Sequence, residues 1–171
     1  MTEFLGASPV RVVLKAKDCN DFQGRAAMDR ELGILLDERA ITAVMNEYCH
    51  AMDTGQHDRW MACFTADAVY DVALPDGRIY ARLEGEADFR KFITGYKVLP
   101  GHKHVYVTPV FDIDPDAGEA TVEAYWFMLS GSEAKAGISS LGRSSDRFVK
   151  GADGRWRMRE RRVATEGVAV G

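Results

Sequence analysis

A histidine at the start of a predicted strand is the first residue whose type and position suit catalysis. Side chains alternate along a strand, so one face of residues 102–113 collects mostly titratable, aromatic and hydroxyl groups. These are His102, His104, Tyr106, Thr108 and Val110. Such a face is typical of a cavity lining, and an imidazole exchanges a proton near neutral pH. The pattern predicts His104 as a general base, with a structural or solvent-facing histidine as the alternative.

An aspartate and a tyrosine lie near the end of a predicted helix. Tyr48 falls on the apolar stripe of this helix, so its ring is expected to point inward, as a core or a pocket residue. Asp53 falls in the last turn, where a carboxylate opposes the helix dipole. On an ideal helix Asp53 lies at the edge of the stripe rather than in its middle. The spacing leaves open whether Asp53 faces a pocket or the solvated loop before Gly55.

Further aromatic and basic residues complete the candidate site. The aromatic residues expected to contact a substrate are Trp60, Tyr70, Tyr106 and Trp126. In the last predicted strand, alternation assigns Arg155, Arg157, Arg159 and Arg161 to a solvated outer face. The opposite face then includes Arg162, which makes this residue a predicted anion contact. The sequence has no phosphate loop, Rossmann fingerprint, nucleophile elbow or metal-ligand spacing, so we expect no metal and no other cofactor.

The bulk composition excludes several classes of protein. A chain of 171 residues suits one ordinary domain, and a net charge of −4 argues against nucleic-acid binding. No apolar run approaches the roughly 18 residues that a membrane span needs, and Met1–Pro9 does not resemble a secretory signal. The 3 cysteines have no metal-binding spacing, which is typical of reduced thiols in a cytoplasmic protein.

Helical periodicity marks three segments. The first is predicted over Asp29–Met52 and ends before Gly55, a natural helix stop. Two shorter helices are predicted over Asp58–Phe64 and Glu84–Tyr96. Residues 1–28 do not share this pattern, so we expect an N-terminal arm or a disordered leader, in which residues 10–14 could form a short strand.

Strand patterns fill the rest of the chain. A hairpin is predicted from residues 68–74 and 78–83 around Pro75-Asp76-Gly77. Four long strands follow at residues 102–113, 120–130, 138–150 and 155–164, separated by turn-forming residues. Early helices and a late antiparallel meander predict an α+β domain over residues 29–167, with the helices on one face of the sheet. Composition alone does not establish whether the sheet curls around the long helix to enclose a cavity.

Four short strings in this order resemble the SnoaL-like branch of the NTF2-like superfamily, which includes scytalone dehydratases. They are YCHAMD at residues 48–53, FTADAV at 64–69 after Trp60, HVYVTP at 104–109, and DGRWR at 153–157. The spacing of Tyr48, Asp53 and His104 is also similar to that of bacterial bile-acid 7α-dehydratases. The resemblance covers roughly residues 35–165 and implies a cone-shaped curved antiparallel sheet wrapped around helices, with an internal pocket.

The resemblance implies a site as well as a fold. In that family the residue matching Asp53 pairs with the histidine matching His104, and the residue matching Tyr48 polarises a carbonyl or assists the leaving group. The leading hypothesis is a cofactor-independent dehydratase-type lyase or isomerase that acts on a small, cyclic, hydrophobic carbonyl compound. The alternatives are a non-catalytic subunit, like the β-subunit of a ring-hydroxylating dioxygenase, and a small-molecule-binding domain. Relatives usually form dimers or trimers, so a homodimer or homotrimer is expected.

Overall fold

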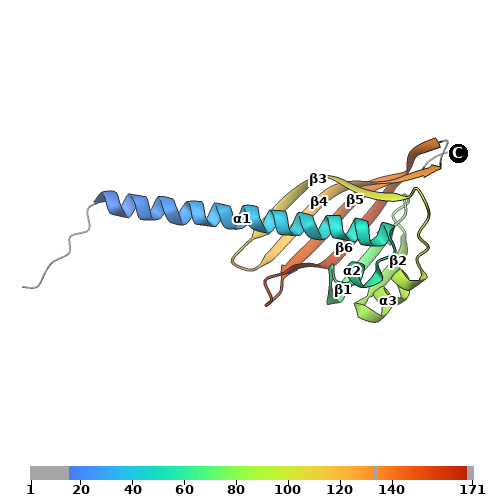
Figure 1. Cartoon of the computed structure of the whole chain (residues 1–171), viewed down its shortest axis with the longest axis horizontal. Coiled ribbons are helices and arrows are strands. Elements are labelled where there is room, and N and C mark those ends of the chain that lie inside the picture. The colour runs from blue at the N-terminus through green and yellow to red at the C-terminus, as the bar shows by residue number, and fades with distance from the viewer. Residues whose placement is uncertain (1–15, 133–134, 169–171) are drawn as a thin grey trace, which may run out of the picture. The chain divides into compact units, whose positions relative to one another are not determined.

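The computed structural model describes residues 16–132 and 135–168. The chain divides into two compact units, Met1–Gly33 and Ile34–Gly171. Within the first unit, the described residues belong to helix α1 (Ala16–Asp53), which continues into the second unit (Figure 1). The prediction that this helix begins at Asp29 is wrong, because the helical backbone already starts at Ala16. The suggested strand at residues 10–14 lies outside the described residues.

The end of α1 is set by a glycine, as predicted. Gly55 has a φ of 68°, a left-handed conformation that favours glycine. The amides of Gly55 and Gln56 donate to the carbonyls of Met52 and Ala51 at 3.3 and 2.8 Å, which is the Schellman pattern. This cap fixes where the helix stops and therefore where Asp53, its last residue, is placed.

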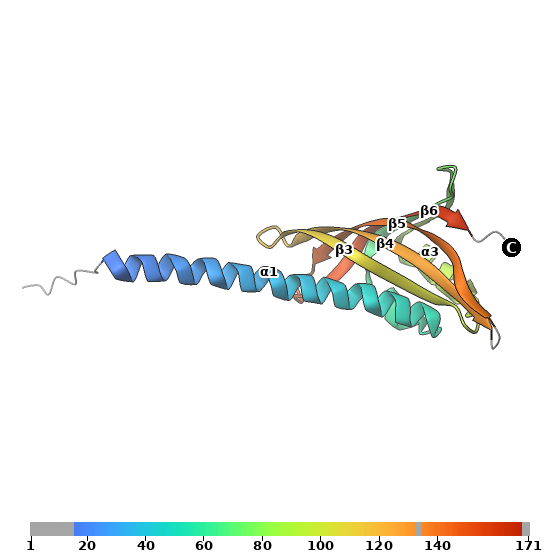
Figure 2. The ribbon, with the colours of Figure 1, turned by 90° about the horizontal axis from the view of Figure 1, so that it is seen from above.

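The other elements follow the predicted order. Helix α2 (His57–Met61) is shorter than expected because Phe64 already begins strand β1 (Phe64–Ala73). Strand β2 (Ile79–Glu84) and helix α3 (Gly85–Gly95) come next. The four long strands are β3 (Lys103–Asp114), β4 (Glu119–Ser132), β5 (Lys135–Lys150) and β6 (Trp156–Val168), and Figure 2 shows β3, β4 and β5 side by side.

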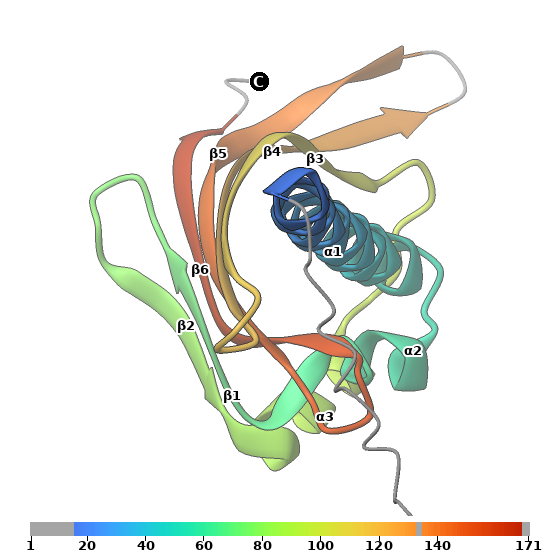
Figure 3. The same ribbon diagram turned by 90° about the vertical axis from the view of Figure 1, so that its left-hand side faces the viewer.

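A single six-stranded sheet has the order β2-β1-β6-β5-β4-β3. The predicted antiparallel hairpin and meander are confirmed. The hairpin joins the meander through a parallel pairing of β1 with β6, so the expectation of a purely antiparallel sheet is corrected at this one position. Figure 3 shows the sheet curving around the part of α1 that follows Gly33.

Two β-bulges change which side chains face the concave side. In β3, Val107 pairs with Tyr125 and Val110 with Glu123, so Thr108 and Pro109 together oppose a single residue of β4. Thr108 has a φ of 49°, a strained value for a β-branched residue. The prediction that Val110 shares a face with His104 is therefore wrong: Val110 is 69% exposed, and Phe111 packs against the core instead.

The second bulge lies in β6. Arg147 pairs with Glu160 and Phe148 with Met158, which leaves Arg159 as an extra residue. Met158 faces inward before the bulge, and Arg161 and Val163 face inward after it. Because side chains alternate with a period of two, one extra residue exchanges the inner and outer faces of the rest of the strand.

Candidate active site

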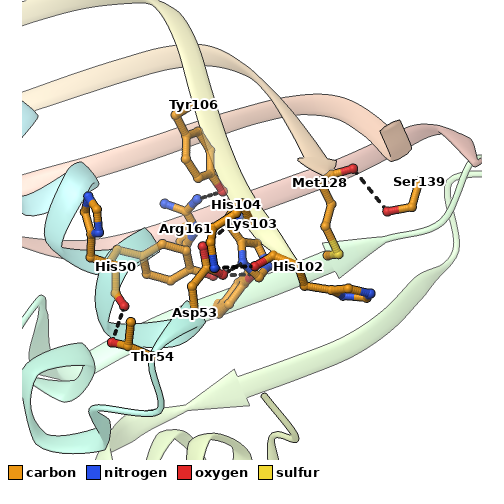
Figure 4. Close-up of polar contacts among 12 residues, drawn as sticks. His50, Asp53, Thr54, His102, Lys103, His104, Tyr106, Met128, Ser139 and Arg161 are labelled. Atoms are coloured by element: carbon orange, nitrogen blue, oxygen red, sulfur yellow. Dashed lines mark hydrogen bonds and ion pairs between the residues drawn. The ribbon is translucent and has the colours of Figure 1, made fainter. Parts of the chain in front are cut away.

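Asp53 and His104 meet where the end of α1 approaches the start of β3. The His104 Nδ1 lies 2.6 Å from Asp53 Oδ1, and the His104 backbone amide donates to Asp53 Oδ2 at 2.9 Å. The Asp53 side chain is 6% exposed and the His104 side chain is 12% exposed. Figure 4 shows them directed toward each other, with Tyr106 and Arg161 nearby. One carboxylate therefore fixes both the ring and the backbone of the histidine.

This geometry suits a general base. A carboxylate that accepts a hydrogen bond from Nδ1–H holds the imidazole in one tautomer. The other nitrogen, Nε2, is then the atom that can take a proton. The ring of Tyr96 lies beside the histidine, with ring centroids 6.4 Å apart, and burial together with the nearby Asp53 charge raises the pKa of Tyr96.

A buried guanidinium occupies the interior of the sheet next to this pair. The Arg161 side chain is 1% exposed, and its Cζ lies 4.2 Å from the ring centroid of Tyr48 and 4.7 Å from that of Tyr106. Its Nη2 donates to the Tyr106 hydroxyl. The sequence interpretation placed Arg161 on the solvated outer face, and this is wrong because the bulge at Arg159 reverses the alternation.

Arg161 is paired with a carboxylate that the sequence interpretation also missed. Its Nη1 donates to Asp146 Oδ2 at 2.9 Å, and Ser144 Oγ donates to the same oxygen at 3.3 Å. Burial raises the pKa of Asp146 well above its usual value, and the hydrogen bond from Ser144 opposes part of that rise. A sequence signal for the inward position of Arg161 is the spacing of Met158 and Val163. These two apolar residues are five positions apart, so in a strand without a bulge they would face opposite sides of the sheet.

Two tyrosine hydroxyls complete the polar interior. The Tyr48 and Tyr70 hydroxyls are 3.2 Å apart, and both residues are buried. Burial raises the pKa of Tyr48 well above its usual value, and the neighbouring Tyr70 adds to that rise. Tyr48 therefore stays protonated at neutral pH and can donate a hydrogen bond to an oxygen atom. This position agrees with the inward orientation predicted from the apolar stripe.

The remaining predicted contact residues lie in different places. Tyr70, Tyr106 and Trp126 face the concave side of the sheet. Trp60 is fully buried among aromatic rings, 4.7 Å from Phe64 between centroids, and its indole nitrogen has no hydrogen-bond partner in the described part of the chain. The predicted interior position of Arg162 is wrong: its side chain is 71% exposed because the bulge turns it outward. Whether the inward residues bind a substrate stays a prediction.

Several hollows open on the surface away from the Asp53–His104 pair. One groove of about 500 Å³ lies between α1, α2 and the β5–β6 turn, where Val44 and Trp156 form part of its lining. A second hollow of about 330 Å³ lies on the outer sheet face beside Arg162. Neither is lined by Asp53 or His104.

Metal and thiol chemistry find little support in the described part of the chain. Residues 16–132 and 135–168 contain no group of three or more His, Cys, Asp or Glu side chains that could hold a metal ion. Burial raises the pKa of Cys49 and Cys63 to about 12, so both thiols are protonated at neutral pH. Among the same residues, no helix is long and apolar enough to cross a membrane.

The fold and this site define a class: an α+β domain in which a helix end and a strand of the curved sheet together place a buried Asp–His pair beside an arginine and tyrosine hydroxyls. Residues 33–162 match the model of the SnoaL-like domain. The chain therefore belongs to the SnoaL-like family, within the NTF2-like superfamily. No curated protein matches it.

Solved structures share the fold. A candidate scytalone dehydratase from Novosphingobium aromaticivorans is 23% identical with a TM-score of 0.66, over 80% of this chain and 89% of that one. The β subunit of a candidate aromatic-ring-hydroxylating dioxygenase from the same species is 14% identical with a TM-score of 0.68, over 81% and 94%. ActVI-ORFA from Streptomyces coelicolor is 16% identical with a TM-score of 0.63, over 75% and 96%. At these identities the likeness establishes the fold and leaves the activity to be argued from the site.

Proposed function

We propose that this protein is a dehydratase-type lyase or an isomerase that acts on a small, cyclic, hydrophobic carbonyl compound without a cofactor. The observation that carries the proposal is the buried Asp53–His104 pair, in which the carboxylate leaves one imidazole nitrogen available as a base. Tyr48, Tyr106 and Arg161 place hydrogen-bond donors in the same interior. A base and fixed donors for an oxyanion are what enolisation requires.

The proposed reaction begins with proton transfer. His104 Nε2 takes the proton from the carbon next to the carbonyl, and the electron pair of that C–H bond moves to the carbonyl oxygen to give an enolate. Tyr48 and the Arg161 guanidinium stabilise the negative oxygen by hydrogen bonding. Asp53 stabilises the imidazolium that forms.

The second step decides between the two reaction types. In a dehydratase the enolate re-forms the carbonyl, the bond from the β-carbon to its hydroxyl breaks, and the imidazolium proton joins the departing hydroxide as water. In an isomerase the same proton returns to a different carbon. Both steps balance without an oxidant, a reductant or a metal, so the proposal needs no cofactor.

A non-catalytic role is the competing hypothesis, because the fold is also that of a dioxygenase β subunit. Such a subunit serves assembly and has no need of a buried Asp–His pair. A small-molecule-binding domain would use the same interior without turnover. Both alternatives predict no proton exchange on a bound carbonyl compound.

The test is hydrogen exchange in deuterated water. Purified protein would be mixed with a panel of cyclic β-hydroxy ketones, of which 3-hydroxycyclohexanone is the simplest, and NMR would follow α-proton exchange and water loss. We expect both to be lost in His104→Ala. Exchange without water loss would assign an isomerase, whereas tight binding without exchange would replace the enzyme by a binding domain.

The expected assembly and location belong to the same proposal. The outer sheet face carries exposed apolar side chains, including Tyr125 at 57% and Leu141 at 45% exposure. These support a homodimer or homotrimer formed through this face. We also propose a cytoplasmic location, which suits a chain whose cysteines lack metal-binding spacing and are expected to be reduced. Light scattering on the purified protein, compared with Tyr125→Lys, tests the assembly: a monomeric wild type contradicts it.

A further inference from the structure

The ion pair between Arg161 and Asp146 is buried more deeply than the Asp53–His104 pair. Arg161 is 1% exposed and Asp146 is 0% exposed. Two of their polar atoms, Arg161 Nε and Asp146 Oδ1, have no hydrogen-bond partner within residues 16–132 and 135–168. A buried ion pair with unsatisfied atoms is a poor source of stability compared with apolar side chains of similar volume. Its presence in the interior is therefore better explained by an effect on what the interior binds.

The interior charges of the described residues nearly cancel. The Asp146 carboxylate offsets the Arg161 guanidinium at 2.9 Å. The other buried charge near them is Asp53, whose partner His104 carries a positive charge only when protonated. Tyr48, Tyr70 and Tyr106 surround the guanidinium as neutral rings. A ligand entering this space meets a net charge of zero or below, even though a guanidinium faces it.

We propose that Asp146 is a specificity-determining residue, which neutralises Arg161 so that the site accepts an uncharged carbonyl compound and rejects a carboxylate. This inference rests on the proposed function for the class of substrate. A ketone oxygen needs a hydrogen-bond donor but brings no charge, so the paired guanidinium suffices. A carboxylate brings a full negative charge into a space where the described residues include Asp146, Asp53 and one buried permanent cation, Arg161.

The test compares two rings of nearly the same shape, acetophenone and benzoate, by isothermal calorimetry at neutral pH. We expect wild-type protein to bind acetophenone at least about tenfold more tightly than benzoate. In Asp146→Asn the side chain keeps its size but loses its charge. Benzoate affinity should then rise about tenfold or more, with acetophenone affinity changed less than about threefold. The gain should vanish in Asp146→Asn/Arg161→Met, which has neither charge.

A matched control lies on the other face of the sheet. Asp71 forms an ion pair with Arg82 at 2.9 Å, and Asp71→Asn removes a carboxylate in the same way without touching the interior. This variant should leave both affinities unchanged. If Asp146→Asn is too unstable for calorimetry, its melting temperature can be followed, because a ligand of the folded state raises it. Benzoate should then raise the melting temperature of Asp146→Asn by more than it raises that of the wild type.

Three results would overturn the inference. They are equal affinity of the wild type for both rings, no gain for benzoate in Asp146→Asn, and a gain of the same size in Asp71→Asn. None of these measurements requires turnover. A failure of the proposed enzyme activity, seen as absent proton exchange, is therefore distinguishable from a failure of this charge-based selection.

Discussion

The role of Asp53 can be tested with one substitution of nearly equal volume. Both oxygens of the Asp53 carboxylate contact His104. Oδ1 lies 2.6 Å from the His104 Nδ1 atom, and Oδ2 accepts a hydrogen bond from the His104 backbone amide at 2.9 Å. Asparagine has one oxygen and one NH₂ group in place of these two acceptors. Asp53→Asn must therefore place an N–H donor opposite one of the two His104 donors, or change the tautomer of the ring.

The size of the effect follows from these contacts. Losing one hydrogen bond to a charged group costs about 1.5–3 kcal/mol. The proton-transfer step also loses the stabilisation of the imidazolium, so the rate should fall by about 10²- to 10⁴-fold, the usual contribution of general acid–base catalysis. The fold should survive, because Asp53 lies at the helix end and its volume hardly changes.

The assay is α-proton exchange of the cyclic β-hydroxy ketone panel in deuterated water, with circular dichroism as the folding check. Asp58→Asn is the matched control, because the Asp58 side chain is 91% exposed and pairs only with Arg90 among the described ion pairs. We expect wild-type rates in this control. Exchange in Asp53→Asn within about threefold of the wild type, while His104→Ala is inactive, would refute the orienting role of Asp53.

Three further predictions follow from particular contacts. Arg161→Met should lower kcat/KM about 10²-fold or more because it removes an oxyanion donor, whereas Arg162→Met, on the outer face, should change it less than about threefold. Burial opposes ionisation of Asp37, but its hydrogen bonds to Lys150 and Trp156 lower the pKa below 3.8, so this carboxylate contributes stability above about pH 4 that is lost as the pH falls through the lowered pKa. Melting curves between pH 6 and pH 2 should show this loss in the wild type and a weaker pH dependence in Asp37→Asn. Since the two described thiols have a pKa of about 12, at most one of the 3 cysteines should react quickly with a disulfide reagent at pH 8 in the native state, and all should react in urea.

Local patterns predicted most of the elements. The apolar stripe identified the helix that ends at Asp53, and Gly55 identified its stop. Both signals are local: the stripe repeats every three or four residues, and the left-handed backbone after the helix favours glycine at one position. The hairpin and the four long strands were also predicted from local signals, namely the turn-forming residues that separate them. The chemical types of Tyr48, Asp53 and His104 marked them as candidates, but only the resemblance to the family paired the last two.

The tertiary structure decided what depends on strand register. One extra residue at Arg159 brings Arg161 inside and turns Arg162 outward, and a similar bulge at Thr108 turns Val110 outward. Strict alternation cannot predict this, since a bulge depends on the register between two paired strands, which the side-chain pattern of one strand does not contain. Pro109 within a strand was a signal of irregularity that could have been used. The sequence by itself therefore determined the elements and the residue types, whereas the register between paired strands determined which of two neighbouring arginines meets Asp146 in the interior.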